Sequence, residues 1–415
     1  MTDPKRPTSL WWQEPPSPFP VLAGDHDADV LVIGGGITGI TLAYTLASRD
    51  TSVVVVDASW LAGAASGNNA GFLMAGRAEP YGELIALYGR AGAKAVLDTG
   101  RRSHQRIRGL IDELGLACEY RVCGSVRLAR TEEEAEDQRA SLPMLVEDGY
   151  RMHEVPVAEV VSPEAAPHFR AAFLDPQDGE FHPVKFLHGV ARAAEKRGAR
   201  LFEHSRVRSA RWRDGQWTAS LDAGQVRARI VVLATNAGAA LDVPALDALI
   251  KPRRGQMLCT APLGRRVVEH PTYAHWGYHY WRQTPDGRLL IGGWRDIDLD
   301  GEVGHGDVPT EPIQAAIERG LQQIIPGGAP IERRWAATMA FARDGRPLVG
   351  WLDAEHHLAI SAGYTGHGLG MAAACTEDLA DLLAFRPAKG IETFSPTRFA
   401  ELAQARDRFL VVGSS

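Results

Sequence analysis

Hydrophobic residues near the start of the chain predict a strand–helix–strand unit. An apolar run, Val30–Ile33, leads into a glycine-rich turn, then into the helical pattern of Thr38–Ser48, and then into a second apolar run, Thr51–Val56. Short apolar runs on either side of a helix are typical of buried parallel strands. Parallel strands joined by a helix form a right-handed crossover. The chain is therefore expected to contain an α/β domain.

The rest of the chain changes in pattern twice. A second α/β stretch begins near Pro183, and after Lys251 short strand-like runs rich in aromatic residues take over. Predicted helices are 82–118, 131–149, 184–197 and 371–384, and predicted strands are 201–203, 207–212, 217–221, 230–234, 272–283, 288–294 and 357–361. Related motifs lie far apart along the chain, which predicts that one domain is built from discontinuous segments.

Composition narrows the class of protein. The chain has 415 residues, of which 45% are hydrophobic and 23% charged, with a formal net charge of -6. This length predicts two or three domains, and the lack of a dense Lys/Arg run argues against a nucleic-acid partner. Four cysteines without a CxxC pair favour free thiols in a reducing compartment. No uninterrupted apolar run is long enough to span a membrane, so we expect a cytoplasmic protein with no membrane insertion. We also expect no metal site.

The turn after the first strand carries a dinucleotide-binding fingerprint. Gly34, Gly36 and Gly39 satisfy GxGxxG between a strand and a helix, the context that gives this motif its meaning. The three glycines permit a tight turn, a close pyrophosphate and close helix–strand packing, in that order. The helix N-terminus attracts phosphate, and Asp57 ends the next strand where a ribose would bind. The predicted contacts are Gly34, Gly36, Ile37, Thr38, Gly39, Asp57 and Ala58.

Further loops of small residues favour FAD over NAD. One loop, Gly63–Gly71, follows the fingerprint closely, a second follows the strand that ends near Ala234, and a third, Gly363–Met371, lies far downstream. NAD needs only the first unit, whereas a longer flavin nucleotide explains all of them; an NAD(P)-linked dehydrogenase is the alternative. The additional predicted cofactor contacts are Ala65, Ser66, Asn69, Thr235, Gly238, Gly366, His367 and Gly368.

On these motifs the sequence resembles the D-amino-acid oxidase/sarcosine oxidase superfamily of FAD-dependent amine oxidoreductases, over nearly the whole chain. Arg254-Gly255-Gln256 and the segment Tyr280–Arg288 match as well. The Trp11/Trp12 arm and Gly179–Pro183 look most like the γ-glutamylputrescine oxidase branch. The resemblance implies an N-terminal arm (1–27), a Rossmann-like FAD-binding domain of the glutathione-reductase type (28–85, 155–245 and 335–415) and a β-rich α+β substrate domain (86–154 and 246–334). It also implies that the backbone of Val207 contacts the adenine side.

Departures from the family bear on the substrate. Met339, Gly366 and Gly370 stand where the resemblance would place cationic anchors for a substrate carboxylate. We therefore expect an amine without a carboxylate on the reacting carbon, including polyamine derivatives, or a carboxylate held by Arg282, Arg295 or Arg343. The family's oxygen-activating lysine has no counterpart between Lys251 and Lys389, so oxygen and another electron acceptor both stay open. The residues that link flavin covalently in relatives are absent, which predicts non-covalent FAD.

The predicted reaction is hydride transfer from the CH–NH bond of an amine to flavin N5, after which the imine is hydrolysed. The aromatic segment expected above the flavin supplies most candidates, and the C-terminal glycine loop supplies another. The candidate catalytic residues are His279, Tyr280, Trp281, Arg282 and His367. Strand alternation places His279 and Trp281 on one face and Tyr280 on the other. A D-amino-acid or N-methyl amino-acid oxidase or dehydrogenase, and a tRNA-modifying flavoprotein, are the alternatives.

Overall fold

The predicted strand–helix–strand unit forms the centre of the first sheet. The computed structural model describes residues 7–237, 244–388, 390–404 and 411–412. β1 (Gly24–Ile33) and β2 (Val53–Val56) run parallel and are joined by α1 (Ile37–Ala47). The valines of β2 point alternately into two hydrophobic clusters, one on each face of the sheet. Burial on both faces explains why β2 is an unbroken apolar run.

Nine strands of the described residues make up this first sheet. Their order is β19-β9-β10-β11-β1-β2-β8, and β18 joins β11 while β17 pairs with β18. β11 lies parallel to both β1 and β18. The remaining bounds are β8 (Arg200–Phe202), β9 (Val207–Arg213), β10 (Gln216–Leu221), β11 (Gly224–Leu233), β17 (Leu348–Asp353), β18 (Leu358–Ala362) and β19 (Val411–Val412).

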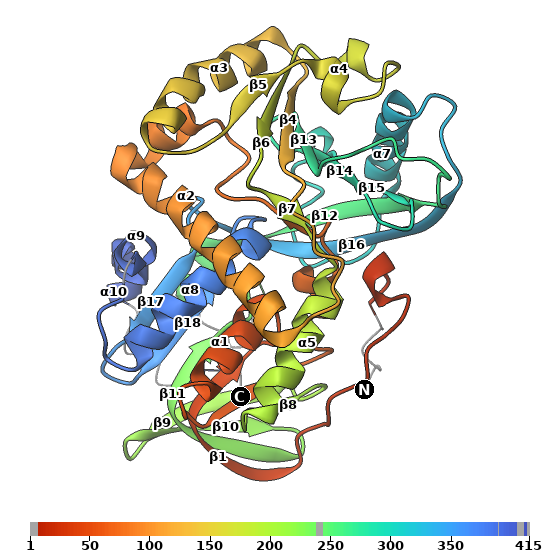
Figure 1. Ribbon diagram of the computed structural model, residues 1–415. Coiled ribbons are helices and arrows are strands. Elements are labelled where there is room, and N and C mark those ends of the chain that lie inside the picture. The colour runs from red at the N-terminus through yellow and green to blue at the C-terminus, as the bar shows by residue number, and fades with distance from the viewer. Residues whose placement is uncertain (1–6, 238–243, 389, 405–410, 413–415) are drawn as a thin grey trace.

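Helices cover one face of this sheet in the lower half of the molecule (Figure 1). α1 packs between α5 (Pro183–Lys196) and α8 (Gly368–Leu383). The long α2 (Tyr81–Leu114) crosses α8 and reaches the second sheet, and Gly89 interrupts its helical geometry. Within the described ranges, none of the helices combines the length and the apolarity needed to cross a bilayer.

A second sheet fills the upper half of the molecule (Figure 1). Eight strands of the described residues form it, in the order β16-β12-β15-β14-β13-β4-β6-β5. Their bounds are β4 (Ser125–Ala129), β5 (His153–Val155), β6 (Ala171–Asp175), β12 (Ile250–Thr260), β13 (Thr272–Ala274), β14 (His279–Gln283), β15 (Leu289–Gly293) and β16 (Ile331–Ala342). α7 (Glu311–Ile324) packs on β12 and β15, and α3 (Glu132–Glu147) packs on β4 and β6.

Short elements complete the fold. The pair β3 (Phe72–Leu73) and β7 (Gly179–Glu180) lies apart from the two large sheets. The other helices are α4 (Val157–Val160), α6 (Pro244–Leu249), α9 (Ile391–Phe394) and α10 (Ala400–Gln404), and the 3-10 turns are η1 (Leu10–Trp12), η2 (Ala65–Gly67), η3 (Ala166–His168), η4 (Arg295–Ile297) and η5 (Pro396–Arg398).

The chain passes between the sheets at residues other than those predicted. β6 and the end of β5 lie in the segment assigned to the FAD-binding domain from residue 155, yet both strands pair in the second sheet. β16 also pairs there, along β12, although 335–415 was assigned to the first domain. Residues 24–27, expected in the N-terminal arm, belong to β1. The pattern of apolar residues in a strand does not show which distant strand it pairs with, so the sheet to which β5, β6 and β16 belong depends on tertiary contacts.

Candidate active site between the two sheets

A cavity of about 740 Å³ lies where the carboxyl ends of β1, β2 and β11 meet the second sheet. Ile33, Val56 and Ala234 mark the strand ends. Strands β12, β14 and β16 line the opposite side. In open α/β sheets, ligands bind at the carboxyl ends of the strands where neighbouring connections diverge. The position of the cavity therefore matches a nucleotide site on one side and leaves space for a substrate under the second sheet.

The fingerprint glycines divide into two kinds. Gly34 and Gly36 line the cavity, and Gly34 has a φ of 113°, which favours glycine. A Cβ on Gly36 would meet only Ser66 Oγ at 3.0 Å, whereas a Cβ on Gly39 would lie 1.9 Å from the Gly34 carbonyl oxygen. Gly39 itself does not line the cavity. Gly36 thus keeps the backbone open toward a ligand, and Gly39 lets α1 pack against β1.

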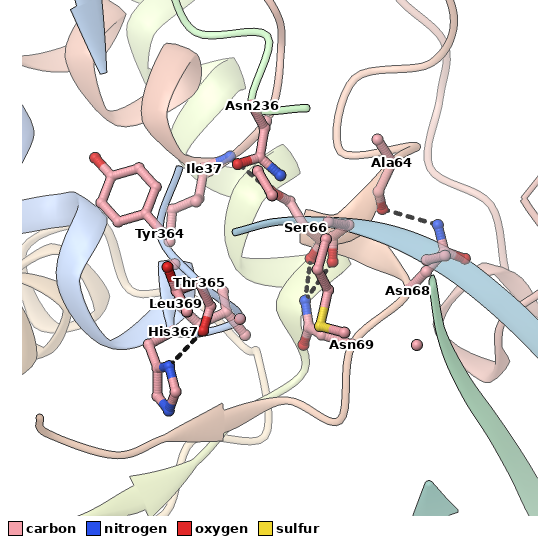
Figure 2. A pocket seen from close by; sticks show the side chains of 18 of the residues that line it. Ile37, Ala64, Ser66, Asn68, Asn69, Asn236, Tyr364, Thr365, His367 and Leu369 are labelled. Carbon is pink, nitrogen blue, oxygen red and sulfur yellow. Dashed lines mark hydrogen bonds between the residues drawn. The ribbon is translucent and has the colours of Figure 1, made fainter. Parts of the chain in front are cut away.

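The loop 63–71 is held mostly by its own side chains (Figure 2). Asn69 Nδ2 donates to the carbonyls of Ala65 and Ser66 at 2.9 and 2.8 Å, and its Oδ1 accepts from the Gly71 N–H. The Ile37 N–H, at the start of α1, donates to Ser66 Oγ at 2.9 Å. Asn69 therefore shapes the loop with its side chain, while Ser66 lies at the helix N-terminus where a phosphate would bind.

The N-terminal arm supports this loop from behind. Trp11 and Trp12 are 2% and 4% exposed, so both side chains of the arm are buried against the first domain. Trp11 Nε1 donates to the Asn69 carbonyl at 2.6 Å, and Ser9 Oγ donates to the Gly67 carbonyl at 2.7 Å. The arm therefore helps fix the cavity wall.

The predicted ribose and adenine contacts also gather at the cavity. Asp57 Oδ2 accepts from the Gly35 N–H and its Oδ1 accepts from the Ser59 N–H, each at 2.7 Å. Burial raises the pKa of Asp57, and these two N–H groups counteract that effect. Each oxygen retains acceptor capacity for a ribose hydroxyl. The cavity is further lined by Ala58, Ala65, Val207, Thr235 and Thr38, and Gly238 lies outside the described residues.

The C-terminal glycine loop places His367 in the cavity wall (Figure 2). Gly366 and Gly368 line the cavity as well. His367 Nδ1 lies 2.7 Å from the Thr365 carbonyl, so this nitrogen carries the hydrogen. Nε2 is buried without a hydrogen-bond partner among the described residues. Burial lowers the pKa of His367 to about 4. The ring is therefore neutral at neutral pH, with Nε2 free to accept a hydrogen bond.

An aromatic wall from the second sheet faces the loops. Tyr280 on β14 and Tyr273 on β13 pack edge to face with ring centroids 6.2 Å apart. Trp276 and Tyr278, from the β13–β14 turn, and Phe341 on β16 extend the wall. Burial raises the pKa of Tyr280 to about 12, so its phenol stays neutral. Such a wall stabilises a cation or encloses a neutral amine.

Arg295 brings a cationic side chain to this wall. It lines the cavity, and its guanidinium carbon lies 4.5 Å from the Tyr278 ring centre and 4.7 Å from that of Phe341. No ion-pair partner for it occurs in the part of the chain that the structure describes, whereas Arg343 pairs with Glu401 at 2.8 Å outside the cavity. Of the three arginines proposed as carboxylate anchors, only Arg295 is in position.

Three candidate catalytic residues lie away from the cavity. Because Tyr280 faces the cavity, its neighbours His279 and Trp281 point to the opposite face of β14. His279 stacks on Trp294 with ring centroids 4.0 Å apart, and Trp281 lies in the core under the sheet. Arg282 is completely buried and donates to two backbone carbonyls at 2.8 and 3.1 Å. We correct the prediction accordingly: His279 and Trp281 lie behind the wall, Arg282 holds the backbone of the loop 63–71, and none of the three lines the cavity.

One charged pair in the cavity carries no signal in the sequence. Arg77 and Glu79, from the loop after β3, line it and form an ion pair. Burial alone would raise the pKa of Glu79, but its contact with Arg77 keeps the pKa below its usual value. Arg77 also donates to the Gly345 carbonyl at 2.6 Å. No motif or periodicity marks this loop, so only proximity in the fold reveals the pair.

These residues fit FAD. The glycine cradle, the helix N-terminus and Asp57 would hold the phosphates and ribose, and the loops 63–71 and 363–370 extend along the rest of the cavity. The chain matches the family model described as "DAO: FAD dependent oxidoreductase" over residues 29–382, and it belongs to this family. It is a FAD-dependent amine or amino-acid oxidoreductase.

Individual relatives cover most of the chain. It is 28% identical to gamma-glutamylputrescine oxidoreductase of Escherichia coli, covering 85% of this chain and 83% of that one. It is 26% identical to the probable oxidoreductase OrdL of Rhizobium meliloti, covering 90% of each. The fold is similar to the crystal structure of glycine oxidase from Geobacillus kaustophilus, with a TM-score of 0.78, 21% identity and coverage of 90% and 99%.

Proposed function

We propose that this protein oxidises the CH–NH bond of an amine whose anionic group lies away from the reacting carbon, as in an acidic polyamine derivative. The observation that carries the proposal is Arg295, a cavity cation without an ion-pair partner among the described residues. A carboxylate is best held by such a guanidinium. Met339 and Gly366, which line the cavity at the family's anchor positions, bring no positive charge. The name of the Escherichia coli relative is consistent with a polyamine derivative.

The side chains of the cavity would bind and orient the amine. Tyr280 and Tyr273 enclose it, and His367 Nε2 accepts a hydrogen bond from an N–H group. Enclosure by apolar rings disfavours the ammonium form, so the amine loses its proton more easily on binding. Neither Tyr280 nor His367 takes the amine proton at neutral pH. Burial raises the pKa of Tyr280 to about 12, so its phenol is already protonated, and lowers that of His367 to about 4, so its ring is a very weak base.

Bound FAD would supply the acceptor for the hydride, and the imine product would then hydrolyse. We propose that FAD is held non-covalently, as the loops 63–71 and 338–343 lack the histidine and cysteine expected of covalent attachment. Thr235, Val207 and Ala58 would contact the adenosine end. The cytoplasmic location is part of the proposal and is supported by four free cysteines among the described residues.

Anaerobic reduction of the flavin tests the substrate class. The purified holoenzyme is mixed with polyamines, polyamine derivatives that carry a carboxylate, N-methyl amino acids, D-amino acids and glycine, and flavin absorbance is followed. We expect bleaching to be most efficient with the carboxylate-bearing derivatives. Preference for α-amino acids would overturn the proposal in favour of the amino-acid alternative. Reoxidation by oxygen compared with an artificial dye then distinguishes an oxidase from a dehydrogenase.

The tRNA-modifying alternative is not better supported. The chain has a formal net charge of -6 and no dense Lys/Arg run, whereas binding of a polynucleotide depends on such positive charge. Titration of the holoenzyme with tRNA at low salt is the direct check.

A further inference from the structure

A network of ionisable side chains lies behind the aromatic wall. It consists of Glu134, His275, Asp296, His279 and Arg130, and we call it the His275 network. His275 Nδ1 lies 3.0 Å from Glu134 Oε1, and its Nε2 lies 3.6 Å from Asp296 Oδ2. His279 Nε2 lies 3.5 Å from the other Asp296 oxygen. The network thus joins α3, the β13–β14 turn and η4, which are far apart in sequence.

The ring nitrogens of the two histidines have different partners. His275 forms a hydrogen bond with Glu134 through Nδ1, and its Nε2 lies in looser contact with Asp296. His279 Nδ1 lies 3.2 Å from an Arg130 nitrogen, which makes Nδ1 the acceptor and places the hydrogen on Nε2 toward Asp296. Burial lowers the pKa of His279, so its ring is neutral. Tyr278 and Trp276 are the other neighbours of the His275 ring.

The backbone next to the network is strained. His275 and Trp276 have φ values of 50° and 48°, and Gly277 follows with 80°. Trp294, which precedes Arg295, has a φ of 58°. Residues other than glycine seldom adopt these angles, and they persist where surrounding contacts over-determine them. A Cβ on Gly277 would lie 2.2 Å from Ala78 Cβ, so the turn also presses against the loop that carries Arg77 and Glu79.

Each strained segment presents side chains to the cavity. Trp276 and Tyr278 alternate with the network residues His275 and His279. Arg295 stands directly before Asp296 and lines the cavity. A contact that fixes His275 against Asp296 therefore fixes the turn against η4, and with it the distance between the aromatic wall and the cation.

We propose that His275, bridging Glu134 and Asp296, is a positioning residue that clamps the β13–β14 turn to η4 and so holds Trp276, Tyr278 and Arg295 in the geometry that binds the substrate's anionic group. The contacts that form this clamp do not depend on which reaction the site catalyses. The link to substrate rests on the proposed function, in which Arg295 anchors a carboxylate.

The variant His275→Asn removes the bridge with little backbone cost, because asparagine tolerates positive φ. Glu134→Gln removes the partner charge at nearly constant shape. The matched control is His357→Asn, since His357 also has a positive φ (52°) in a strand-joining turn of the first sheet, away from the cavity. All three are prepared as holoenzymes, and equal FAD content shows that the nucleotide site is intact.

Hydrogen exchange tests the clamp. The Tyr278 N–H donates to the His275 carbonyl at 2.9 Å, and the Trp294 N–H donates to the Tyr278 carbonyl at 2.8 Å. We expect exchange of these two amides to become at least about tenfold faster in His275→Asn and Glu134→Gln, because local opening costs less free energy. His357→Asn should leave them unchanged. Unchanged exchange in both network variants would overturn the clamp.

Ligand affinity tests positioning. Benzoate is titrated into each holoenzyme while the flavin spectrum is followed, and KM and kcat are measured with the preferred amine. We expect the benzoate Kd and the KM to rise about tenfold in the network variants, since small displacements of a binding group have large effects. The double variant His275→Asn/Glu134→Gln should have a benzoate Kd and a KM no higher than those of either single variant. Faster exchange with unchanged Kd and KM would overturn the positioning role. A wild-type spectrum that does not respond to benzoate would instead overturn Arg295 as the anchor, and the exchange result would still decide the clamp.

Discussion

Gly36→Ala separates ligand binding from folding at the dinucleotide fingerprint. Gly36 has a φ of -80°, which alanine adopts without strain, and it caps the N-terminus of α1. The new Cβ would meet Ser66 Oγ at 3.0 Å and nothing else closer than 3.9 Å. That oxygen ends a short side chain that can rotate. The fold should therefore tolerate the methyl group, which would project where a pyrophosphate approaches the helix N-terminus.

The expected loss of affinity follows from overpacking. Inserting one extra carbon into a well-packed contact costs about 1–3 kcal/mol, which corresponds to a Kd for FAD raised about 5- to 150-fold. The unfolding free energy of the apoprotein should change by less than about 1 kcal/mol. Gly39→Ala should behave differently, because its Cβ would lie 1.9 Å from a backbone oxygen. It is expected to destabilise the apoprotein by several kcal/mol or prevent folding.

The assay compares three alanine variants. Flavin absorbance gives FAD per chain, titration of apoprotein with FAD gives Kd, and denaturant unfolding gives stability. Gly109→Ala in α2 is the control, since a Cβ there meets nothing within 4 Å, and it should retain FAD and gain about 1 kcal/mol of stability. Wild-type FAD affinity in Gly36→Ala, or unfolding of Gly36→Ala to the same degree as Gly39→Ala, would refute the reasoning.

Three further predictions concern the substrate and the cofactor. Arg295→Met should raise KM about 10- to 150-fold for a carboxylate-bearing amine, because it removes a charge-assisted hydrogen bond of about 1.5–3 kcal/mol. The KM for an amine without a carboxylate should stay nearly the same. An equal rise in KM for both substrates would contradict the role of Arg295 as anchor. Steady-state kcat/KM should rise with pH and reach a plateau above the pKa of the substrate amine. The reason is that His367, with a pKa of about 4, and Tyr280, with a pKa of about 12, do not titrate near neutral pH. An inflection at the same pH for amines of different basicity would show that a group of the enzyme titrates instead. Acid precipitation should release yellow FAD into the supernatant, and colour retained in the pellet would show a covalent link.

Local patterns were sufficient to predict the strand–helix–strand unit at the centre of the first sheet. The run from Val30 to Val56 alternates strand, glycine turn and helix within one short stretch, so neighbouring residues determine its fold. Gly34, Gly36 and Asp57 line the cavity as the motif predicts. Their chemistry depends on backbone approach and on strand ends, which a sequence displays directly. The family match over residues 29–382 agrees with this assignment.

The sequence by itself determined the nucleotide fingerprint and the alternation that gives β14 two faces. It also led to the expectation, from resemblance, that no cation stands at the family's anchor positions. Only the tertiary structure decided that Tyr280 lines the cavity while His279, Trp281 and Arg282 do not. The same holds for the pairing of β5, β6 and β16 in the second sheet. Periodicity defines the two faces of a strand but not which face meets the cavity. It also cannot bring Arg77 and Arg295 to the same cavity across more than two hundred residues. Those outcomes depend on the packing of distant segments, and that packing is set by which apolar surfaces cover one another in the folded chain.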